Sequence, residues 1–246
     1  MIEIKQLKKS FDGKPVLKGI NLTISEGQIM VIAGGSGCGK TVLLRSIIGL
    51  VQPDSGSIRV NEQEITQMDR NQLFEIRKQF GMLFQSAALF DSMTVTENIG
   101  LALREHTKLA DSEIHSRVHK KLALVGLEGA EHKKPAELSG GMKKRVGLAR
   151  ALIMDPKYVL FDEPTTGLDP VTADAINRLI IDTQTQLGIT AIVVTHDMHS
   201  AFLVGDQIAM IYDGKVIFSG TPDSFRENDH PHVKQFTESA SLRSRT

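Results

Sequence analysis

The run Gln28-Ile29-Met30-Val31-Ile32-Ala33-Gly34-Gly35-Ser36-Gly37-Cys38-Gly39-Lys40-Thr41 carries the strongest structural signal in this chain of 246 residues. Its mostly apolar beginning, up to Ala33, predicts a buried strand, and Val42 to Leu50 predict a helix. Between them, Gly34 to Thr41 match the pattern G-x-x-x-x-G-K-S/T of a phosphate-binding loop. The strand before the pattern and the helix after it are the context that such a loop requires.

The residue types of this loop suit a phosphate chain. Glycines let successive backbone N–H groups turn inward around the phosphates, and the helix N-terminus adds partial positive charge. We expect Lys40 to lie between the β- and γ-phosphates of a nucleotide and the Thr41 hydroxyl to hold Mg²⁺. Cys38, inside the loop, is either a small filler residue or a redox-sensing thiol.

Outward from the loop, the pattern predicts an α/β fold. Phe80–Phe84, Tyr158–Phe161 and Ala191–Val194 are short runs that predict buried strands, and strands apolar on both faces indicate a sheet covered on both sides. Residues 86–155 predict mainly helices, which we expect to form an inserted subdomain. Another helix is expected to start at Asp169-Pro170.

Both ends of the chain have antiparallel character. Met1–Ser25 predicts two strands around Asp12-Gly13, and Asp213-Gly214 predicts a hairpin between Ile208–Tyr212 and Lys215–Phe218. We expect residues 226–246, which are polar, to form an extension beyond the core.

Composition excludes several classes of protein. The chain has 29 Lys+Arg and 29 Asp+Glu, so its net charge is zero, which argues against bulk nucleic-acid binding. Hydrophobic residues at 41% exclude a disordered chain, and the single cysteine excludes an intramolecular disulfide framework. No apolar run approaches the ~20 residues that span a bilayer, and Met1–Lys5 lacks a signal-peptide core. We expect a cytoplasmic protein that reaches a membrane only through a partner.

Three polar residues follow predicted strands, where ligands of α/β sheets bind. Asp162 and Glu163 end the run Tyr158–Phe161, and we expect Asp162 to face the Mg²⁺ site and Glu163 the attacking water. The alternative is that both carboxylates lie in solvent at the strand end. His196 follows the strand Thr190–Thr195 and is either a γ-phosphate sensor or a structural residue.

A second anion site is predicted at Leu138-Ser139-Gly140-Gly141-Met142, which begins a helix with exposed amides, a hydroxyl and the positive charge of Lys143-Lys144-Arg145 nearby. One phosphate chain hardly needs two such sites in one subunit. The simplest interpretation is that the second site serves the nucleotide of a neighbouring copy in a symmetric pair.

With these motifs in this order, residues 2–225 resemble the ATP-binding cassette (ABC) family. The resemblance implies a P-loop NTPase (RecA-like) core with an antiparallel β subdomain and an inserted α-helical subdomain at about 86–155. It also implies bound ATP and Mg²⁺, and a head-to-tail homodimer with two ATP molecules sandwiched between the subunits. In this family Gln85 is the Q-loop glutamine, His196 the switch histidine and Asp169 the D-loop aspartate that works across the interface. Phe11 matches the aromatic residue that stacks on adenine.

The residues that the resemblance assigns to catalysis are Lys40, Glu163 and His196. Those it assigns to the nucleotide are Phe11, Val16, Gly34, Gly35, Ser36, Gly37, Cys38, Gly39, Lys40, Thr41, Val42, Gln85, Ser139, Gly141, Asp162 and Asp169. Those it assigns to Mg²⁺ are Thr41, Gln85 and Asp162. Val42 departs from the hydroxyl residue usual in the family, which puts one hydrogen bond to the α-phosphate in doubt.

Within the family, Met142-Lys143-Lys144 departs from the usual glutamines and resembles the Mce-associated ATPases of Mla-type phospholipid (organic-solvent tolerance) transporters. Gly81–Asp91 and Leu103–Thr107 resemble the same group. The resemblance implies a subunit held peripherally at the cytoplasmic face of the bacterial inner membrane by permease subunits. It also implies an Mce-domain lipid-binding protein and a small accessory subunit as partners, no nucleic acid, and phospholipid moving between inner and outer membrane. We expect the permease to contact the apolar region of Ala87–Phe90 and Met93.

Three alternatives remain open from the sequence. The first is the ATPase of a nutrient-uptake or lipoprotein-release ABC system. The second is a non-transport ABC ATPase, although the chain lacks the long coiled coil or second cassette of such proteins. The third is a nucleotide-binding regulator without turnover, although Glu163 and His196 supply what hydrolysis needs.

Overall fold

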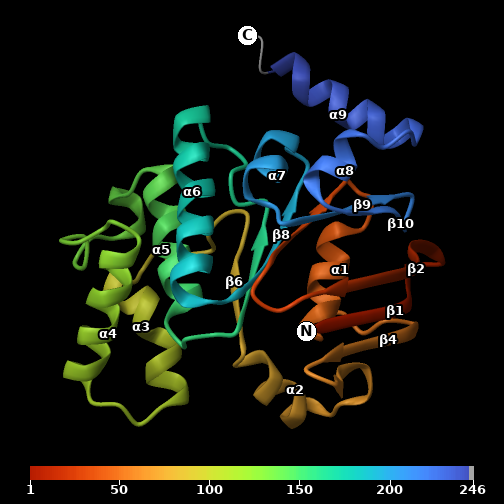
Figure 1. Ribbon diagram of the computed structural model, residues 1–246. Helices are drawn as coiled ribbons and strands as arrows, with labels where there is room; N and C mark the ends of the chain where they lie inside the picture. Colours follow the sequence, from red (N-terminus) through yellow and green to blue (C-terminus); the bar gives the residue numbers. More distant parts are fainter. Residues whose placement is uncertain (244–246) are drawn as a thin grey trace. The chain divides into compact units, whose positions relative to one another are not determined.

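A computed structural model describes residues 1–243, with side chains up to Glu238, so residues 244–246 of the predicted extension lie outside the described part (Figure 1). The chain divides into two compact units. Unit 1 comprises Met1–Arg77 and the residues from Thr190 onward, and unit 2 comprises Lys78–Ile189.

Unit 1 contains an antiparallel sheet in the order β2-β1-β4-β5. Its strands are β1 (Ile2–Phe11), β2 (Lys14–Ile24), β4 (Ser55–Val60) and β5 (Gln63–Glu64). Asp12 and Gly13 join β1 to β2 with φ of 50° and 75°, which suits a tight hairpin turn. The predicted antiparallel pair at the N-terminus is therefore confirmed, whereas β4, which pairs with β1, was not predicted.

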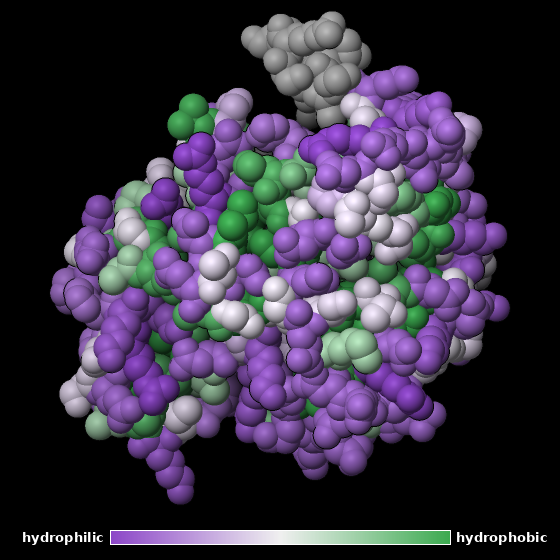
Figure 2. All heavy atoms as spheres, viewed as in Figure 1, coloured by the Kyte–Doolittle hydropathy of each residue, from purple (hydrophilic) through white to green (hydrophobic). Residues whose placement is uncertain are grey.

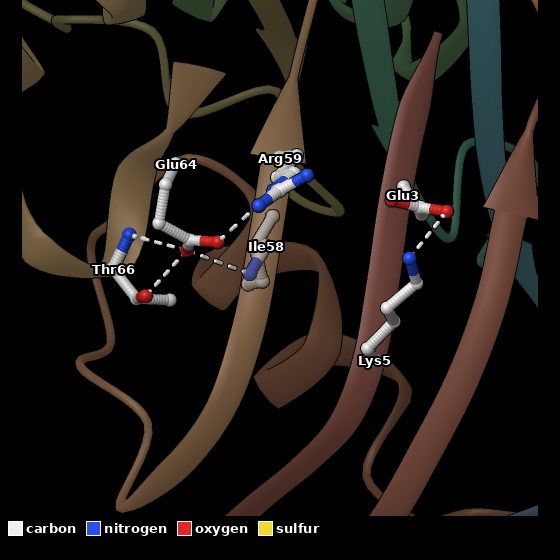
Figure 3. A network of polar contacts seen from close by, with 6 residues as sticks. All are labelled: Glu3, Lys5, Ile58, Arg59, Glu64 and Thr66. Carbon is white, nitrogen blue, oxygen red and sulfur yellow. Dashed lines mark hydrogen bonds and ion pairs between the residues drawn. The ribbon is translucent and has the colours of Figure 1, made fainter. Parts of the chain in front are cut away.

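The edge of this sheet is fixed by one carboxylate (Figure 3). Glu64 accepts hydrogen bonds from the backbone N of Ile58 (3.1 Å) and of Thr66 (3.3 Å), and its other oxygen lies 3.6 Å from Arg59 Nε. On β1 of the same sheet, Lys5 pairs with Glu3 at 2.9 Å. The Glu64 contacts hold the two-residue strand β5 beside β4 although it buries little apolar surface.

The second set of strands in unit 1 has the order β10-β9-β3-β8. These strands are β3 (Ile29–Ala33), β8 (Thr190–Thr195), β9 (Gln207–Tyr212) and β10 (Lys215–Gly220). β3 pairs in parallel with β8 and β9, and every residue of β3 and β8 is buried. β9 and β10 form the predicted hairpin around Asp213-Gly214. The apolar runs Ile29–Ala33 and Thr190–Thr195 are thus buried strands, as predicted, and the structure shows that they pair in parallel.

Helices complete unit 1. They are α1 (Lys40–Ile47), the 3-10 helix η1 (Ile65–Gln67), α2 (Arg70–Arg77), α7 (Met198–Val204), α8 (Pro222–Arg226) and α9 (Pro231–Arg243). In the C-terminal segment, Phe225 and Val233 are fully buried, and the ring of His232 stacks on Tyr212 of β9 with 3.6 Å between centroids. The segment 225–233 therefore packs against its own unit.

Unit 2 pairs two parallel strands with helices. Its elements are β6 (Phe80–Leu83), α3 (Val95–His106), α4 (Asp111–Leu124), η2 (Pro135–Glu137), α5 (Gly140–Leu152), β7 (Tyr158–Asp162) and α6 (Pro170–Leu187). α4 buries Ile114, Val118 and Leu122 on one face. Asp169 caps α6 at its predicted start and accepts a hydrogen bond from the N of Thr172 at 3.0 Å.

Two glycines let α5 lie directly against β6. A Cβ on Gly81 would collide with the carbonyl oxygen of Ala151, and a Cβ on Gly147 would lie 2.7 Å from Leu83 Cδ1. Val146, Leu148 and Leu152 of α5 are buried. The helix and the strand therefore pack without room for intervening side chains, and this contact fixes the position of α5 in unit 2.

The outer face of α4 is charged, with Glu113, Arg117 and Lys120 partly or fully exposed. Hydrophilic side chains predominate in Figure 2 over the part of the surface where Figure 1 draws this helix. Within residues 1–243, no helix is both long enough and apolar enough to cross a membrane.

Asn98, fully buried on α3, organises the segment that precedes the helix. Its Nδ2 donates to the carbonyl oxygens of Phe90 (3.1 Å), Met93 (3.2 Å) and Thr94 (3.0 Å), and its Oδ1 accepts from Phe90 N (2.8 Å). Asn98→Ala should lower the free energy of unfolding by about 2–3 kcal/mol, because it removes the side-chain hydrogen bonds that join α3 to the backbone of Phe90, Met93 and Thr94. Urea unfolding measures this. The exposed Asn71→Ala should change it by less than about 0.5 kcal/mol, and equal stabilities would contradict the assigned role.

Candidate functional site

The phosphate-binding pattern forms a loop between β3 and α1 of unit 1. Gly34, Gly37 and Gly39 have φ of 153°, 77° and 105°, values that only glycine adopts without strain. A Cβ on Gly34 would also collide with the carbonyl oxygen of Ile211 and would lie 2.8 Å from Cys38 Sγ. The glycines are therefore required by the shape of the loop, and the predicted arrangement of strand, loop and helix is present.

Lys40 is 6% exposed, and its Nζ lies over this loop. The ammonium donates to the carbonyl oxygens of Gly34 (2.8 Å) and Gly35 (2.9 Å). Both acceptors are neutral, so the buried positive charge is hydrogen-bonded without being neutralised by them. A buried cation in such a loop favours an anion, and this donor set fits a phosphate group.

Two residues expected to contact the nucleotide belong to the β1–β2 hairpin of unit 1. Val16 Cγ1 would lie 3.4 Å from a Cβ on Gly39, so Val16 borders the end of the phosphate-binding loop. Phe11, paired with Lys14 at the hairpin tip, is 44% exposed, and Lys9 Nζ lies 5.3 Å from its ring centroid. An exposed aromatic ring beside a lysine offers a face on which a base could stack.

His196 lies at the same sheet edge as the loop. In the parallel pair β3–β8, Thr195 is in register with Ala33, so the next residues along the two strands are His196 and Gly34. His196 is exposed, whereas Thr195 is buried. The register thus brings a predicted phosphate sensor to the edge where the phosphate-binding loop begins.

The acidic pair lies in unit 2 at the end of β7. Asp162 is 6% exposed, and Glu163 Oε2 accepts a hydrogen bond from the Thr166 hydroxyl at 3.0 Å. Glu163 has a φ of 51°, a left-handed conformation that costs a non-glycine residue about 1–2 kcal/mol. Such strain is concentrated at functional sites. Because Leu83 is in register with Phe161, Gln85 and Glu163 are each two residues beyond the same pair.

Sequence reasoning missed that Lys144 is buried, at 5% exposure. Its Nζ donates to the carbonyl oxygen of Gln85 in a short hydrogen bond and to that of Glu163 at 3.3 Å. Burial lowers the pKa of Lys144, and the charges of Glu163 and Asp162 oppose this. Helical spacing could have revealed it, because Lys144 lies one turn before the buried Leu148 on the same face of α5.

Arg150, also on α5, holds the segment after Gln85. Its guanidinium donates to the carbonyl oxygens of Ala87 and Ala88, both at 2.6 Å, and burial lowers its pKa. Both alanines have positive φ. The expectation that Ala87 contributes to a docking surface is wrong, because its side chain is 1% exposed and packs toward Gly147. Phe90, in contrast, is 49% exposed.

The predicted second anion site begins α5. Ser139 is exposed, and its Oγ caps the helix by accepting a hydrogen bond from Met142 N at 3.2 Å. Gly141 is buried, and a Cβ there would lie 2.6 Å from Thr172 Cγ2 at the start of α6. Asp169 caps that helix. The pKa of Asp169 is lowered by hydrogen bonds from Thr172, most strongly from its side chain and next from its backbone N–H. Unit 2 therefore brings Ser139, Gly141 and Asp169 to adjoining helix N-termini.

Comparisons with known proteins agree with this geometry. A family model described as "ABC transporter" matches residues 17–166. The "Probable ribonucleotide transport ATP-binding protein mkl" of Mycobacterium tuberculosis is 45% identical over 96% of this chain, which spans only 66% of that relative. The "Intermembrane phospholipid transport system ATP-binding protein MlaF" of Escherichia coli is 39% identical over 97% of this chain and 88% of its own length.

Two solved structures are also similar. The dimeric ATP-binding cassette MJ0796 in a post-hydrolysis state bound to ADP and Pi has a TM-score of 0.83 at 32% identity, covering 90% of this chain and 99% of its own. The protein cbiO1 of Clostridium perfringens, part of the ABC transporter complex cbiONQ, has a TM-score of 0.85 at 33% identity. The match covers 99% of this chain and 93% of cbiO1.

Ser139 has a structural role that can be separated from any role in anion binding. Ser139→Ala should lower the free energy of unfolding by about 1 kcal/mol because α5 loses its cap, whereas Ser139→Asp, a good capping residue, should retain stability. Thermal or urea unfolding measures both. As a control, Ser116→Ala, at an exposed position inside α4, should not destabilise the protein. An unchanged stability of Ser139→Ala would mean that the cap contributes nothing.

Proposed function

This chain belongs to the ABC transporter family, and we propose that it is the ATP-hydrolysing motor subunit of a membrane transporter. Its similarity to solved cassettes, with TM-scores of 0.83 and 0.85, confirms the predicted P-loop NTPase (RecA-like) core with an antiparallel β subdomain and an inserted helical subdomain. The observation that carries the proposal is the buried Lys40 ammonium over the glycine loop.

We propose that the loop Gly34–Val42 holds the phosphates of ATP and that Phe11 and Val16 contact the adenine. The positive φ of three loop glycines, the Lys40 geometry and the exposed Phe11 ring support this assignment. Val42 lies in the first turn of α1 and presents no hydroxyl, so the α-phosphate is held by backbone amides there. Cys38, half-buried beside Gly34, is assigned as a filler of the loop.

For hydrolysis we propose Mg²⁺ at Thr41, Gln85 and Asp162, whose oxygen atoms are the ligands that this ion prefers. When bound, the ion would neutralise phosphate charge. Glu163 orients the attacking water and accepts its proton, and His196 contacts the γ-phosphate. The buried Asp162 and the strained backbone of Glu163 support these roles.

We further propose a head-to-tail homodimer in which Ser139, Gly141 and Asp169 serve the partner's nucleotide. The exposed cap of α5 and the adjoining start of α6 support this, as does the dimeric state named for MJ0796. Gly141 has a second reason to be glycine, because Thr172 of its own chain leaves no room for a side chain.

We propose that residues 1–225 form the ATPase domain, with a helical subdomain at about 86–155, and that residues 226–246 form a C-terminal extension.

The proposed cargo is phospholipid moved between inner and outer membrane, because the MlaF relatives of Escherichia coli and Haemophilus influenzae are 39% and 40% identical over nearly the whole chain. The proposed partners are permease subunits, an Mce-domain lipid-binding protein and a small accessory subunit. The protein is then peripheral at the cytoplasmic face of the inner membrane. A second candidate cargo is a ribonucleotide, because of the name of the mkl relative, at 45% identity.

Cargo can be tested on the transporter purified from its host through a tag on this chain. Its ATPase rate should depend on the phospholipid composition of the vesicles. The rate should not respond to added ribonucleotides other than ATP. Stimulation by ribonucleotides alone would favour the second candidate, and the absence of any copurifying membrane protein would contradict the motor proposal.

Glu163→Gln should nearly abolish ATP turnover while leaving ATP affinity unchanged, because the amide cannot accept a proton from water. The expected loss is about 10²–10⁴-fold in kcat. A steady-state ATPase assay measures turnover, and titration with a fluorescent ATP analogue measures affinity. Glu105→Gln, at an exposed position of α3, is the matched control and should have wild-type turnover. Turnover of Glu163→Gln within about threefold of wild type would remove Glu163 from the mechanism.

A further inference from the structure

We propose that Lys144 is a positioning residue for ATP hydrolysis, which holds the backbone of Gln85 and Glu163 from the helix that begins at Ser139. The proposal rests on the proposed role of Glu163. It concerns the segment Met142-Lys143-Lys144, where the chain departs from the glutamines usual in the family.

The geometry connects three functional segments through one atom. Lys144 Nζ donates to the carbonyl oxygen of Gln85 and, at 3.3 Å, to that of Glu163. Gln85 follows β6 and Glu163 follows β7, and their register places both two residues beyond the pair Leu83–Phe161. The ammonium therefore bridges the ends of two neighbouring strands, and it does so from a third element, α5.

The conformation of Glu163 depends on how its backbone carbonyl is held. With a φ of 51°, Glu163 lies in a left-handed conformation that persists only when its surroundings impose it. A donor fixed on its carbonyl restrains the orientation of that peptide and so the direction of the Glu163 side chain. The Thr166 hydroxyl restrains the carboxylate itself, with 3.0 Å between Oγ1 and Oε2. Lys144 thus acts through the backbone and not on the reacting atoms.

Packing alone does not explain a lysine at this position. α5 is seated on β6 by the close approach of Gly81 to Ala151 and of Gly147 to Leu83. A buried cation is costly, and an apolar residue of similar volume commonly serves packing as well or better. Arg150 repeats the arrangement further along α5, where it donates to the carbonyls of Ala87 and Ala88 at 2.6 Å. The two cations tie the segment from Gln85 to Ala88 to α5.

The consequence is mechanical. α5 begins at the cap residue Ser139, proposed to face the partner's nucleotide, and Lys144 lies about one turn further along the helix. A displacement of the start of α5 is therefore carried directly to the carbonyls of Gln85 and Glu163. The Lys144 side chain thus couples engagement of the neighbouring ATP to alignment of the hydrolytic glutamate.

The test compares Lys144→Met, which keeps the volume and removes the donor, with Lys120→Met at an exposed position of α4. Lys144→Met should lower kcat by about 10- to 100-fold, the effect of a small misplacement, with the KM for ATP and the melting temperature little changed. Lys144→Gln, which keeps a donor on a side chain one bond shorter, should recover part of the lost kcat. Should Lys144→Met fail to fold, Lys144→Leu, another apolar side chain without a donor, replaces it in the same comparison.

A double variant identifies the route of the effect. In the Glu163→Gln background, Lys144→Met should cause no further loss of kcat, because both changes act on one group. Wild-type kcat in Lys144→Met, an equal loss in Lys144→Gln, or full additivity with Glu163→Gln would overturn the proposal. If Glu163→Gln alone retained turnover, the role of Glu163 would fail instead, and that result is visible without any Lys144 variant.

Discussion

Parallel strand pairing is the constraint on which the placement of the functional residues depends. Parallel strands end at one edge, and the residues that follow them must meet there. In unit 1 the β3–β8 register brings Gly34 and His196 to that edge, and in unit 2 the β6–β7 register brings Gln85 and Glu163. Because β3, β7 and β8 are buried along their whole length, these positions are fixed by the core.

Buried cations bonded to main-chain carbonyls recur in both units. Lys40 is held by Gly34 and Gly35, and Lys144 by Gln85 and Glu163. In each case the acceptors are neutral, so hydrogen bonding reduces the cost of burial while the positive charge remains. At Lys40 the positive charge favours the binding of a phosphate group. At Lys144 it lies near the carboxylates of Asp162 and Glu163, whose charge favours the protonated ammonium.

Sequence patterns predicted the elements whose cause is local. The buried runs became β3, β7 and β8, Asp169 capped α6, and Asp213-Gly214 formed a hairpin turn, because burial, capping and turn geometry depend on adjacent residues. β4 and α2 escaped prediction, since Ser55–Val60 contains little apolar alternation and Arg70–Arg77 is mostly polar. The partners of Lys144 lie 59 and 19 residues away, so no local pattern could supply them. Ala87 was misjudged because its carbonyl is held by the distant Arg150 and its methyl group packs toward Gly147, contacts that no local pattern reveals.

The central claim is that the loop Gly34–Thr41 holds ATP through the Lys40 ammonium. The most direct measurement is the equilibrium dissociation constant for ATP of the wild type and of Lys40→Met, with Lys120→Met as the exposed control. Removing a charge-assisted contact from a buried phosphate should weaken binding by at least about 10-fold and up to about 100-fold, while the control binds as the wild type does. Equal affinity of wild type and Lys40→Met would contradict the account.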